Sequence, residues 1–295
     1  MCVASPTFDL RRVRFLDTRS IWLDYSISFD GGPRDRGDLA RVADGGGVRI
    51  AVISDVHGNS WALKAVLDDL AGRSVDGLVD LGDSVYGPLD PGGTAAMLVE
   101  REVPSVRGNE DRAVLQPATG HDSATLLYTR SCLSESGLHW LAGLPLTSAP
   151  FPGLYCCHGS PQQDDERLLE NVSSAGVTLK SSPVLAAQLA EVRQPVVLCG
   201  HSHLPHTVAL PEGRLIVNPG SVGLPAYSDQ TPVPHTMETG SPHARYAIVA
   251  RTRAGWRVEH VAVPYDWETA CSAASRHGRE DWAAWLRTGR ANLAP

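Results

Sequence analysis

Apolar runs alternate with amphipathic helical segments from Val48 onward, and this alternation constrains the fold more than any other feature of the chain. The run VRIAVIS at residues 48–54 is continuous and rich in β-branched side chains. Such a run is typical of a strand that is buried on both faces. Residues 59–72 then place their apolar side chains on one helical face, and Asn59 or Ser60 supplies an N-cap.

The same alternation of strand and helix continues through the next segments of the chain. A second strand is predicted at residues 76–83, a second helix at 91–102, and a third strand that ends in a loop at 103–111. The resulting βαβαβ order is typical of an α/β fold with a largely parallel sheet.

The second half is richer in strands than the first. Short apolar runs with turn residues between them predict strands at 153–161, 195–205 and 213–223 and a hairpin at 244–265. We therefore predict a four-layer αββα sandwich, in which two mixed β-sheets pack face to face and are flanked by helices. The remaining predictions are helices in residues 111–150 and 266–290 and an exposed loop over 228–243.

Residues 1–47 differ from the rest of the chain. They show no helical or strand period, and arginine, aspartate and glycine crowd together there. We predict a poorly ordered extension at 1–47 and one domain at 48–295. A GTG start codon encodes valine when it is read internally, so a further hypothesis is that the native protein begins at Val48.

Composition excludes several classes of protein. The formal net charge of -7 gives no counterion release on a nucleic-acid backbone, which argues against general DNA or RNA binding. No apolar run approaches the roughly 20 residues that span a bilayer, and no signal-peptide pattern is present. None of the six cysteines forms a C-x-x-C pair, which favours buried free thiols in a reducing cytoplasm.

Polar residues of one chemical kind follow five of the predicted strands. Ligands of α/β sheets bind at the carboxyl ends of the strands, so these side chains are expected to meet. They are Asp55 and His57, then Asp83, Asn109 and His158, and finally His201 and His203.

Metal binding explains this set better than separate structural roles do. Seven buried polar side chains without partners would each cost about 1–3 kcal/mol. Mixed imidazole and carboxylate ligands suit zinc, iron, manganese or nickel. Seven ligands exceed the need of one tetrahedral ion and suit two ions about 3.5–4 Å apart that share a carboxylate.

The motifs DVHGN, GDSVYGP, RGNED, HGSP and GHSH, in this order and at strand ends, resemble those of the calcineurin-like metallophosphoesterases. The later motif NPGSVGLP resembles the bacterial and archaeal branch of small phosphodiesterases and protein-phosphatase-like proteins. The resemblance extends from residue 48 to about residue 290. It implies a dinuclear-metal enzyme that hydrolyses phosphate esters, foremost phosphodiesters or nucleotides, through a metal-bridging hydroxide.

The resemblance also implies roles for individual residues. Asp55, His57 and His203 would hold one ion, Asp83 would bridge both ions, and Asn109, His158 and His201 would hold the other. The cofactors would be two divalent cations, manganese first, with iron, zinc or nickel as alternatives. The partner would be a phosphate-ester substrate, for which a nucleotide is one candidate.

One position departs from the family pattern. The family has histidine after the asparagine, whereas this chain reads Gly108-Asn109-Glu110-Asp111. The histidine protonates the leaving group, and Glu110 can replace it only if its pKa is raised. We therefore count Glu110 with Asp83 and Asn109 as candidate catalytic residues. The alternative is a leaving group that needs no acid.

Several alternatives stay open at the level of sequence. Arg107 and Arg112 either offset the acidic charge near the site or are solvated. Trp61, Tyr86 and Tyr227 either stack on a nucleotide base or pack in the core or at the rim. The chain is alternatively a phosphoprotein or monoester phosphatase, or a non-catalytic scaffold on the same fold. Neither the natural substrate nor the oligomeric state follows from the sequence.

Overall fold

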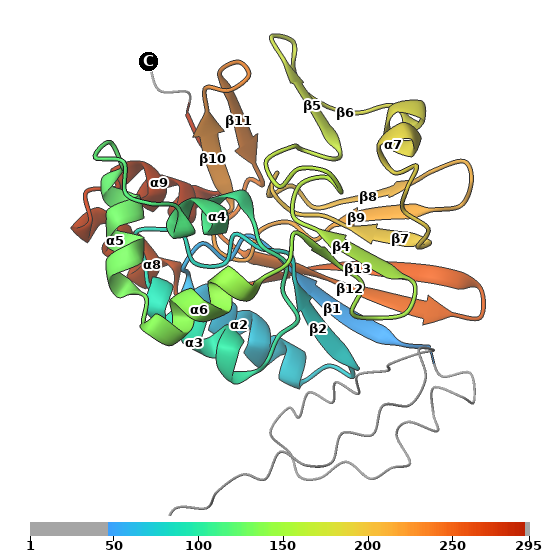
Figure 1. Cartoon of the computed structure of the whole chain (residues 1–295), viewed down its shortest axis with the longest axis horizontal. Coiled ribbons are helices and arrows are strands. Elements are labelled where there is room, and N and C mark those ends of the chain that lie inside the picture. Colours follow the sequence, from blue (N-terminus) through green and yellow to red (C-terminus); the bar gives the residue numbers. More distant parts are fainter. Residues whose placement is uncertain (1–46, 293–295) are drawn as a thin grey trace, which may run out of the picture.

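Two β-sheets built from distant segments form the centre of the computed structural model, which describes residues 47–292 (Figure 1). The first sheet has the order β13-β12-β1-β2. Its strands are β1 (Arg49–Ile53), β2 (Gly77–Asp80), β12 (Ala244–Thr252) and β13 (Gly255–Val263). Strand β1 is parallel to β2 and antiparallel to β12, so the first strand lies beside the last hairpin, β12–β13, of the described chain.

The second sheet has the order β3-β4-β7-β9-β8. Its strands are β3 (Thr147–Ser148), β4 (Leu154–Cys157), β7 (Val196–Leu198), β8 (His206–Ala209) and β9 (Leu215–Asn218). The three central strands β4, β7 and β9 are parallel, and the edge strands β3 and β8 are antiparallel to their neighbours.

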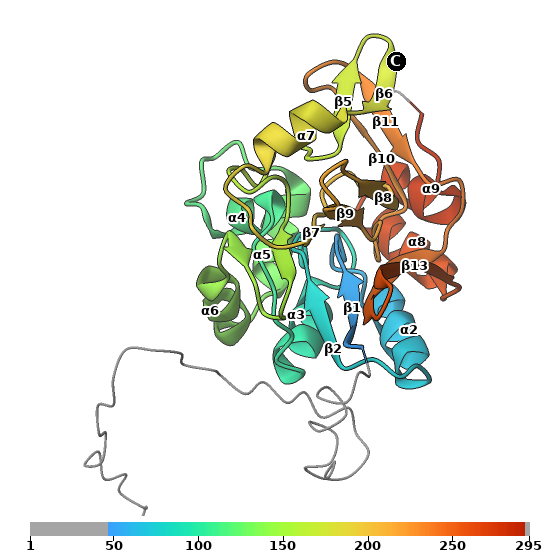
Figure 2. The same ribbon diagram turned by 90° about the vertical axis from the view of Figure 1, so that its right-hand side faces the viewer.

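The strand period of two side chains explains the layers. Ile50 and Val52 of β1 pack between the sheets with residues such as Leu198 of β7. The alternate residues Ala51 and Ile53 face the helices on the other side of the first sheet. The confirmed architecture is two mixed sheets face to face with helices outside (Figure 2).

Helices α2 (Ser60–Ala71) and α3 (Pro91–Glu100) cover the first sheet, and α7 (Ser182–Gln188) lies outside the second. Helix α2 starts as its sequence predicts, because the Asn59 side chain accepts a hydrogen bond from the Ala62 N–H at 3.1 Å. The remaining helices are α4 (Asn109–Leu115), α5 (Ala124–Cys132), α6 (Glu135–Gly143), α8 (Trp267–Arg276) and α9 (Glu280–Thr288).

The third predicted strand is wrong. Within 103–111 only an isolated bridge between Ser105 and Asp80 forms, and helix α4 begins at Asn109. The Asp111 carboxylate accepts a hydrogen bond from the Gly108 N–H at 3.2 Å, which is an N-terminal cap that starts a helix.

The predicted loop at 228–243 is also partly wrong. Strands β10 (Ala226–Asp229) and β11 (His235–Glu238) pair as an antiparallel hairpin. Its prolines fall in the turn, and Met237 is buried, so packing overrides the polar composition. A second hairpin that the sequence analysis missed consists of β5 (Glu170–Ser173) and β6 (Gly176–Leu179).

Other sequence predictions have different outcomes. The predicted extension at 1–47 lies outside the described residues except for Gly47, and a native start at Val48 stays a prediction. Within residues 47–292, no helix has the length and apolar character to span a bilayer. The five described cysteines are free thiols; Cys132 is half-buried and the other four are buried.

Candidate metal centre

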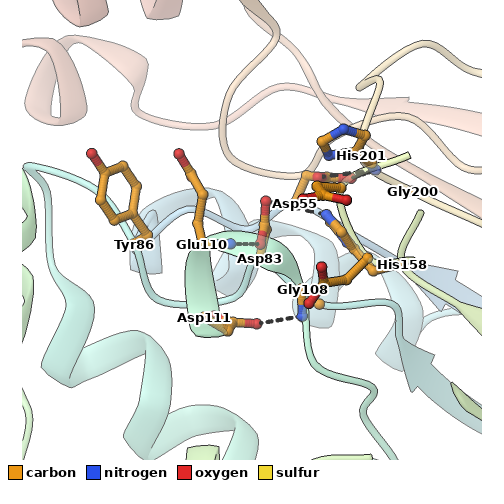
Figure 3. Close-up of polar contacts among 12 residues, drawn as sticks. Asp55, Asp83, Tyr86, Gly108, Glu110, Asp111, His158, Gly200 and His201 are labelled. Carbon is orange, nitrogen blue, oxygen red and sulfur yellow. Dashed lines mark hydrogen bonds and ion pairs between the residues drawn. The ribbon is translucent and has the colours of Figure 1, made fainter. Parts of the chain in front are cut away.

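The loops after β1, β2, β4 and β7 and the start of α4 meet at one edge of the two sheets (Figure 3). All seven side chains that the sequence analysis selected as metal ligands lie on these segments. Six of them fall into two groups with ligand atoms within 4.8 Å of one another. Asp55, His57 and His203 make one group, and Asp83, His158 and His201 make the other. A third such group joins His57 and Asp83 to Glu110.

The first group contains two imidazole nitrogens that face each other. His57 Nε2 lies 3.0 Å from His203 Nε2, and both rings are buried. The Nδ1 atoms are paired with backbone carbonyls, that of His57 with Tyr86 at 3.1 Å and that of His203 with Leu224 at 2.7 Å. With a proton on each Nδ1, the two Nε2 atoms need either a proton or a cation between them. A cation between them and Asp55, whose Oδ1 is 3.3 Å from His203 Nε2, can replace that proton.

Two buried polar atoms of the candidate ligands have no hydrogen-bond partner among the described residues. These are His158 Nε2 and Asn109 Oδ1. His158 Nδ1 is paired with the Leu81 carbonyl at 2.8 Å, so its Nε2 is the free atom, and it lies 3.2 Å from Asp83 Oδ2. Buried atoms of this kind are costly unless a ligand satisfies them. This imidazole and carboxylate, together with an amide oxygen from a residue that lines the same cleft as Asp83, fit a divalent cation.

Backbone strain is concentrated at the same positions. Non-glycine residues seldom adopt the left-handed region, which costs of the order of 1–3 kcal/mol each. Within the described part of the chain, Glu102 is the one residue with positive φ outside the candidate metal ligands and glycines. The other five non-glycine residues with positive φ are all candidate metal ligands: Asp55 at 54°, His57 at 52°, Asp83 at 52°, His201 at 68° and His203 at 62°.

The surrounding backbone holds these strained loops in place. The N–H of Asp55 donates to the Gly82 carbonyl and that of His57 to the Asp83 carbonyl, both at 2.9 Å, so the loops after β1 and β2 support each other. The buried Asp111 carboxylate accepts from the N–H groups of Ser84 and Gly108 and so joins the β2 loop to α4 (Figure 3).

Glycine is required at position 108 because of close packing. A Cβ there would lie 2.1 Å from Asp83 Oδ1 and 2.4 Å from the Asp83 nitrogen. Asp83 Oδ1 also accepts the Glu110 N–H at 2.9 Å. The carboxylate at the centre of the site is therefore fixed by the first turn of α4.

A separate network orients the loop that carries His201 and His203. Ser202 lies between them and donates to the buried Glu170 carboxylate at 2.8 Å. The Asn218 amide donates to the Gly200 carbonyl at 2.8 Å and to the Ser202 hydroxyl at 3.1 Å. The β5–β6 hairpin and β9 thus position two candidate ligands without touching them.

The charge states of the metal-free site follow from burial and close pairing. Burial acts to raise the pKa of Asp55, but the nearby His203 outweighs it and brings the pKa to about 2. For Asp83 burial is likewise outweighed, here by His158, and the pKa falls well below its usual range. Burial acts to lower the pKa of His158, but Asp83 raises it to about 10. Burial and the neighbouring His158 lower the pKa of His201 to about 3.

Glu110 lies beside this cluster, between Tyr86 and Asp83 in Figure 3. Its Oε2 is 3.2 Å from His57 Nδ1, an ion-pair distance, and the same ring nitrogen lies 3.1 Å from the Tyr86 carbonyl. Burial raises the pKa of Glu110 to about 7. For His57, burial is outweighed mainly by Glu110, and the pKa is raised to about 9.

The flanking arginines differ from each other in their contacts. Arg112 makes a two-pronged ion pair with Asp164 at 2.8 and 2.9 Å, so its charge is matched there and does not offset Glu110. The Nε of Arg107 is buried without a partner among the described residues.

A cleft of about 330 Å³ opens over the cluster. Tyr86 and Tyr227, two of the three aromatic residues that the sequence analysis singled out, line it, whereas Trp61 packs against the α8–α9 core. Several other lining residues were not predicted from the sequence, because they come from distant segments and, apart from Leu224 in NPGSVGLP, no motif marks them. They are Arg167, Leu224, Ser228, Asp229, Arg279, Trp282 and Trp285.

Comparisons with known proteins agree with this geometry. Residues 48–240 match the model of the calcineurin-like phosphoesterase superfamily domain. The chain is 25% identical over 263 residues to the uncharacterized protein MJ0912 of Methanocaldococcus jannaschii, with 79% of this chain and 94% of that protein covered.

Two solved structures share the fold. The metallophosphoesterase from Sphaerobacter thermophilus is 27% identical and superposes with a TM-score of 0.65 over 83% of this chain and 100% of that chain. The hypothetical protein PH1004 from Pyrococcus horikoshii OT3 is 20% identical, with a TM-score of 0.62 and the same coverage, and supports the fold alone.

Proposed function

Because the chain belongs to the calcineurin-like phosphoesterase superfamily, we propose that it is a dinuclear-metal phosphoesterase that hydrolyses phosphate esters, foremost phosphodiesters or nucleotides. The observation that carries the proposal is the facing pair of buried imidazole nitrogens, His57 Nε2 and His203 Nε2, 3.0 Å apart. Two neutral imidazoles paired in this way repel each other unless a proton or a cation lies between the facing nitrogens, and a divalent cation would take the place of that proton. The pair lies in a cleft whose size suits a small organic phosphate.

The donor set fits two divalent cations, and manganese is the proposed metal. Asp55, His57 and His203 would hold one cation, Asn109, His158 and His201 the other, and Asp83 both. When bound, two such cations supply an activated water at neutral pH and neutralise charge on the phosphoryl oxygens.

The chain's own residues have complementary tasks. Asp83 stays a carboxylate at any pH near neutrality and is held by the Glu110 N–H at 2.9 Å. Asn109 presents a neutral oxygen, which adds a ligand without adding negative charge. Glu110 faces the cleft beside them and would donate a proton to the leaving oxygen of the ester.

The test is hydrolysis after chelation and manganese readdition. Bis-p-nitrophenyl phosphate and p-nitrophenyl phosphate are compared side by side, with bound metal measured in the same samples. Asp83→Asn and Asn109→Ala are expected to lose activity by about 100-fold or more, because they disturb the centre of the site. Asn171→Ala, at an exposed asparagine of β5, is the matched control and is expected to behave as the wild type.

The preferred ester then assigns the substrate class. Greater activity on the diester supports a phosphodiesterase, and greater activity on the monoester supports a phosphatase. A protein that binds no metal and hydrolyses neither ester would refute the proposal and favour the scaffold.

A further inference from the structure

Arg167 is a largely buried guanidinium in the wall of the cleft, outside every motif that the sequence analysis quoted. Its side chain is 13% exposed. Both of its side-chain hydrogen bonds leave Nη2, one to Asp229 at 3.0 Å and one to the Tyr227 hydroxyl at 3.5 Å. Both partners belong to β10.

The rest of this guanidinium lacks partners. An arginine offers five N–H donors in a rigid fork. The Nε of Arg167 is inaccessible to water and has no acceptor among residues 47–292, and Nη1 makes no hydrogen bond to them. A charged donor without an acceptor is costly, and Nη1, which is not among the atoms closed to water, is the donor that an oxygen of a ligand could satisfy.

The guanidinium also lies beside the candidate metal centre. The Tyr227 hydroxyl, which accepts from Arg167, donates to the His201 carbonyl at 3.4 Å, and the Tyr227 ring packs on His203 with centroids 4.7 Å apart. The phenol therefore separates the guanidinium from the ligand cluster by one side chain. An anion held by Arg167 would sit next to a phosphoryl group held at that cluster.

Resting on the function proposed above, we propose that Arg167 binds a phosphoryl oxygen of the substrate, in a subsite beside Tyr227. A planar fork with unused donors matches the geometry of phosphate oxygens. The oxygen has two possible sources. One is the phosphoryl group under attack, and the other is the neighbouring phosphoryl group of a diphosphate or polyphosphate ester.

Binding of two phosphonates that cannot be hydrolysed separates these sources. Methylphosphonate carries one phosphonyl group and methylenediphosphonate carries two. Each is titrated calorimetrically into the manganese-loaded protein with free manganese buffered. Arg167→Met is expected to weaken binding by about 10- to 100-fold, as for the loss of a hydrogen bond to a charged group. Loss for both ligands assigns the group under attack, and loss for methylenediphosphonate alone assigns the neighbouring group.

Two variants separate binding from a purely structural role. Asp229→Asn removes the competing charge but keeps the oxygen that accepts the Thr231 N–H at 3.0 Å. It is expected to bind the phosphonates as well as the wild type or better. If Arg167 serves only to hold β10, Asp229→Asn weakens binding as Arg167→Met does. Arg214→Met is the matched control, since Arg214 is 17% exposed and donates to the carbonyls of Leu189 and Val192.

The outcomes are distinct from those of the proposed function. A protein that binds manganese and hydrolyses esters, but whose phosphonate affinities are unchanged in Arg167→Met, overturns the role of Arg167 alone. A wild type that binds manganese and neither phosphonate overturns it too. A protein that binds no manganese refutes the proposed function, and this inference with it.

Discussion

Gly108→Ala adds a single methyl group beside the central carboxylate and tests the proposed site directly. The new Cβ would lie 2.1 Å from Asp83 Oδ1 and 2.4 Å from the Asp83 nitrogen, whereas ordinary contact begins at 3.4 Å. Gly108 has φ of -85°, which alanine adopts freely, so the effect is steric. Either the Asp83 loop or the start of α4 must move by about 1 Å, which is enough to cost about 100-fold in rate.

The same substitution has a cost in stability. Forcing a methyl group into a packed site typically costs about 1–3 kcal/mol. For a domain of this size, each kcal/mol lowers the Tm by about 2–4 °C. The expected result is a folded protein with a modestly lower Tm, little bound metal and at least about 100-fold less ester hydrolysis.

Gly143→Ala is the matched control. Gly143 is exposed at the end of α6, and a Cβ there meets nothing within 4 Å. This variant is expected to keep its metal and activity and to be equally or slightly more stable. Thermal unfolding, metal content and hydrolysis are measured on both. A Gly108→Ala protein with two bound metals and wild-type turnover would show that Asp83 is not the shared ligand at this position.

The remaining predictions concern protons, support and thiols. The raised pKa values of His57 and His158, about 9 and 10, keep both rings protonated at pH 7 in the metal-free protein. Metal binding at pH 7 should therefore release about two protons, and metal affinity should rise as pH rises through these pKa values. Calorimetry in buffers of different ionisation enthalpy measures the number of protons released. Release of no protons would contradict the roles of His57 and His158 as ligands. Asp111→Asn replaces a carboxylate that accepts from backbone N–H groups by an amide that also carries donors. Metal affinity, measured by titration, should fall about 10- to 100-fold. Unchanged affinity would show that this carboxylate does not position the site. Burial raises the pKa of Cys156 to about 12. Thiol-specific labelling of the native protein should therefore modify the half-buried Cys132 and spare Cys156. Equal labelling of the two thiols would contradict the fold around β4.

Helix α4 is an element whose position the local sequence pattern did not predict. The order of the preceding elements predicted a strand within residues 103–111 that ends in a loop, yet the chain forms one bridge at Ser105 and then a helix. Asp111 starts that helix through contacts with the β2 loop, a segment more than 20 residues away. The local composition of this segment allows either a short strand or a capped helix, and its contacts with the loop after β2 decide between them.

The sequence by itself determined the parallel strands at the carboxyl edge and the candidate ligands that follow them, because the side-chain period and the polar strand ends are local properties. Only the tertiary structure decided the left-handed backbone at five of those ligands and the residues that line the rest of the cleft. Arg167, the β10–β11 hairpin and Trp282 of α9 reach the cleft from separate parts of the chain. The physical reason is that burial and hydrogen bonding between distant segments hold strained loops and aim side chains, and no local period encodes such contacts.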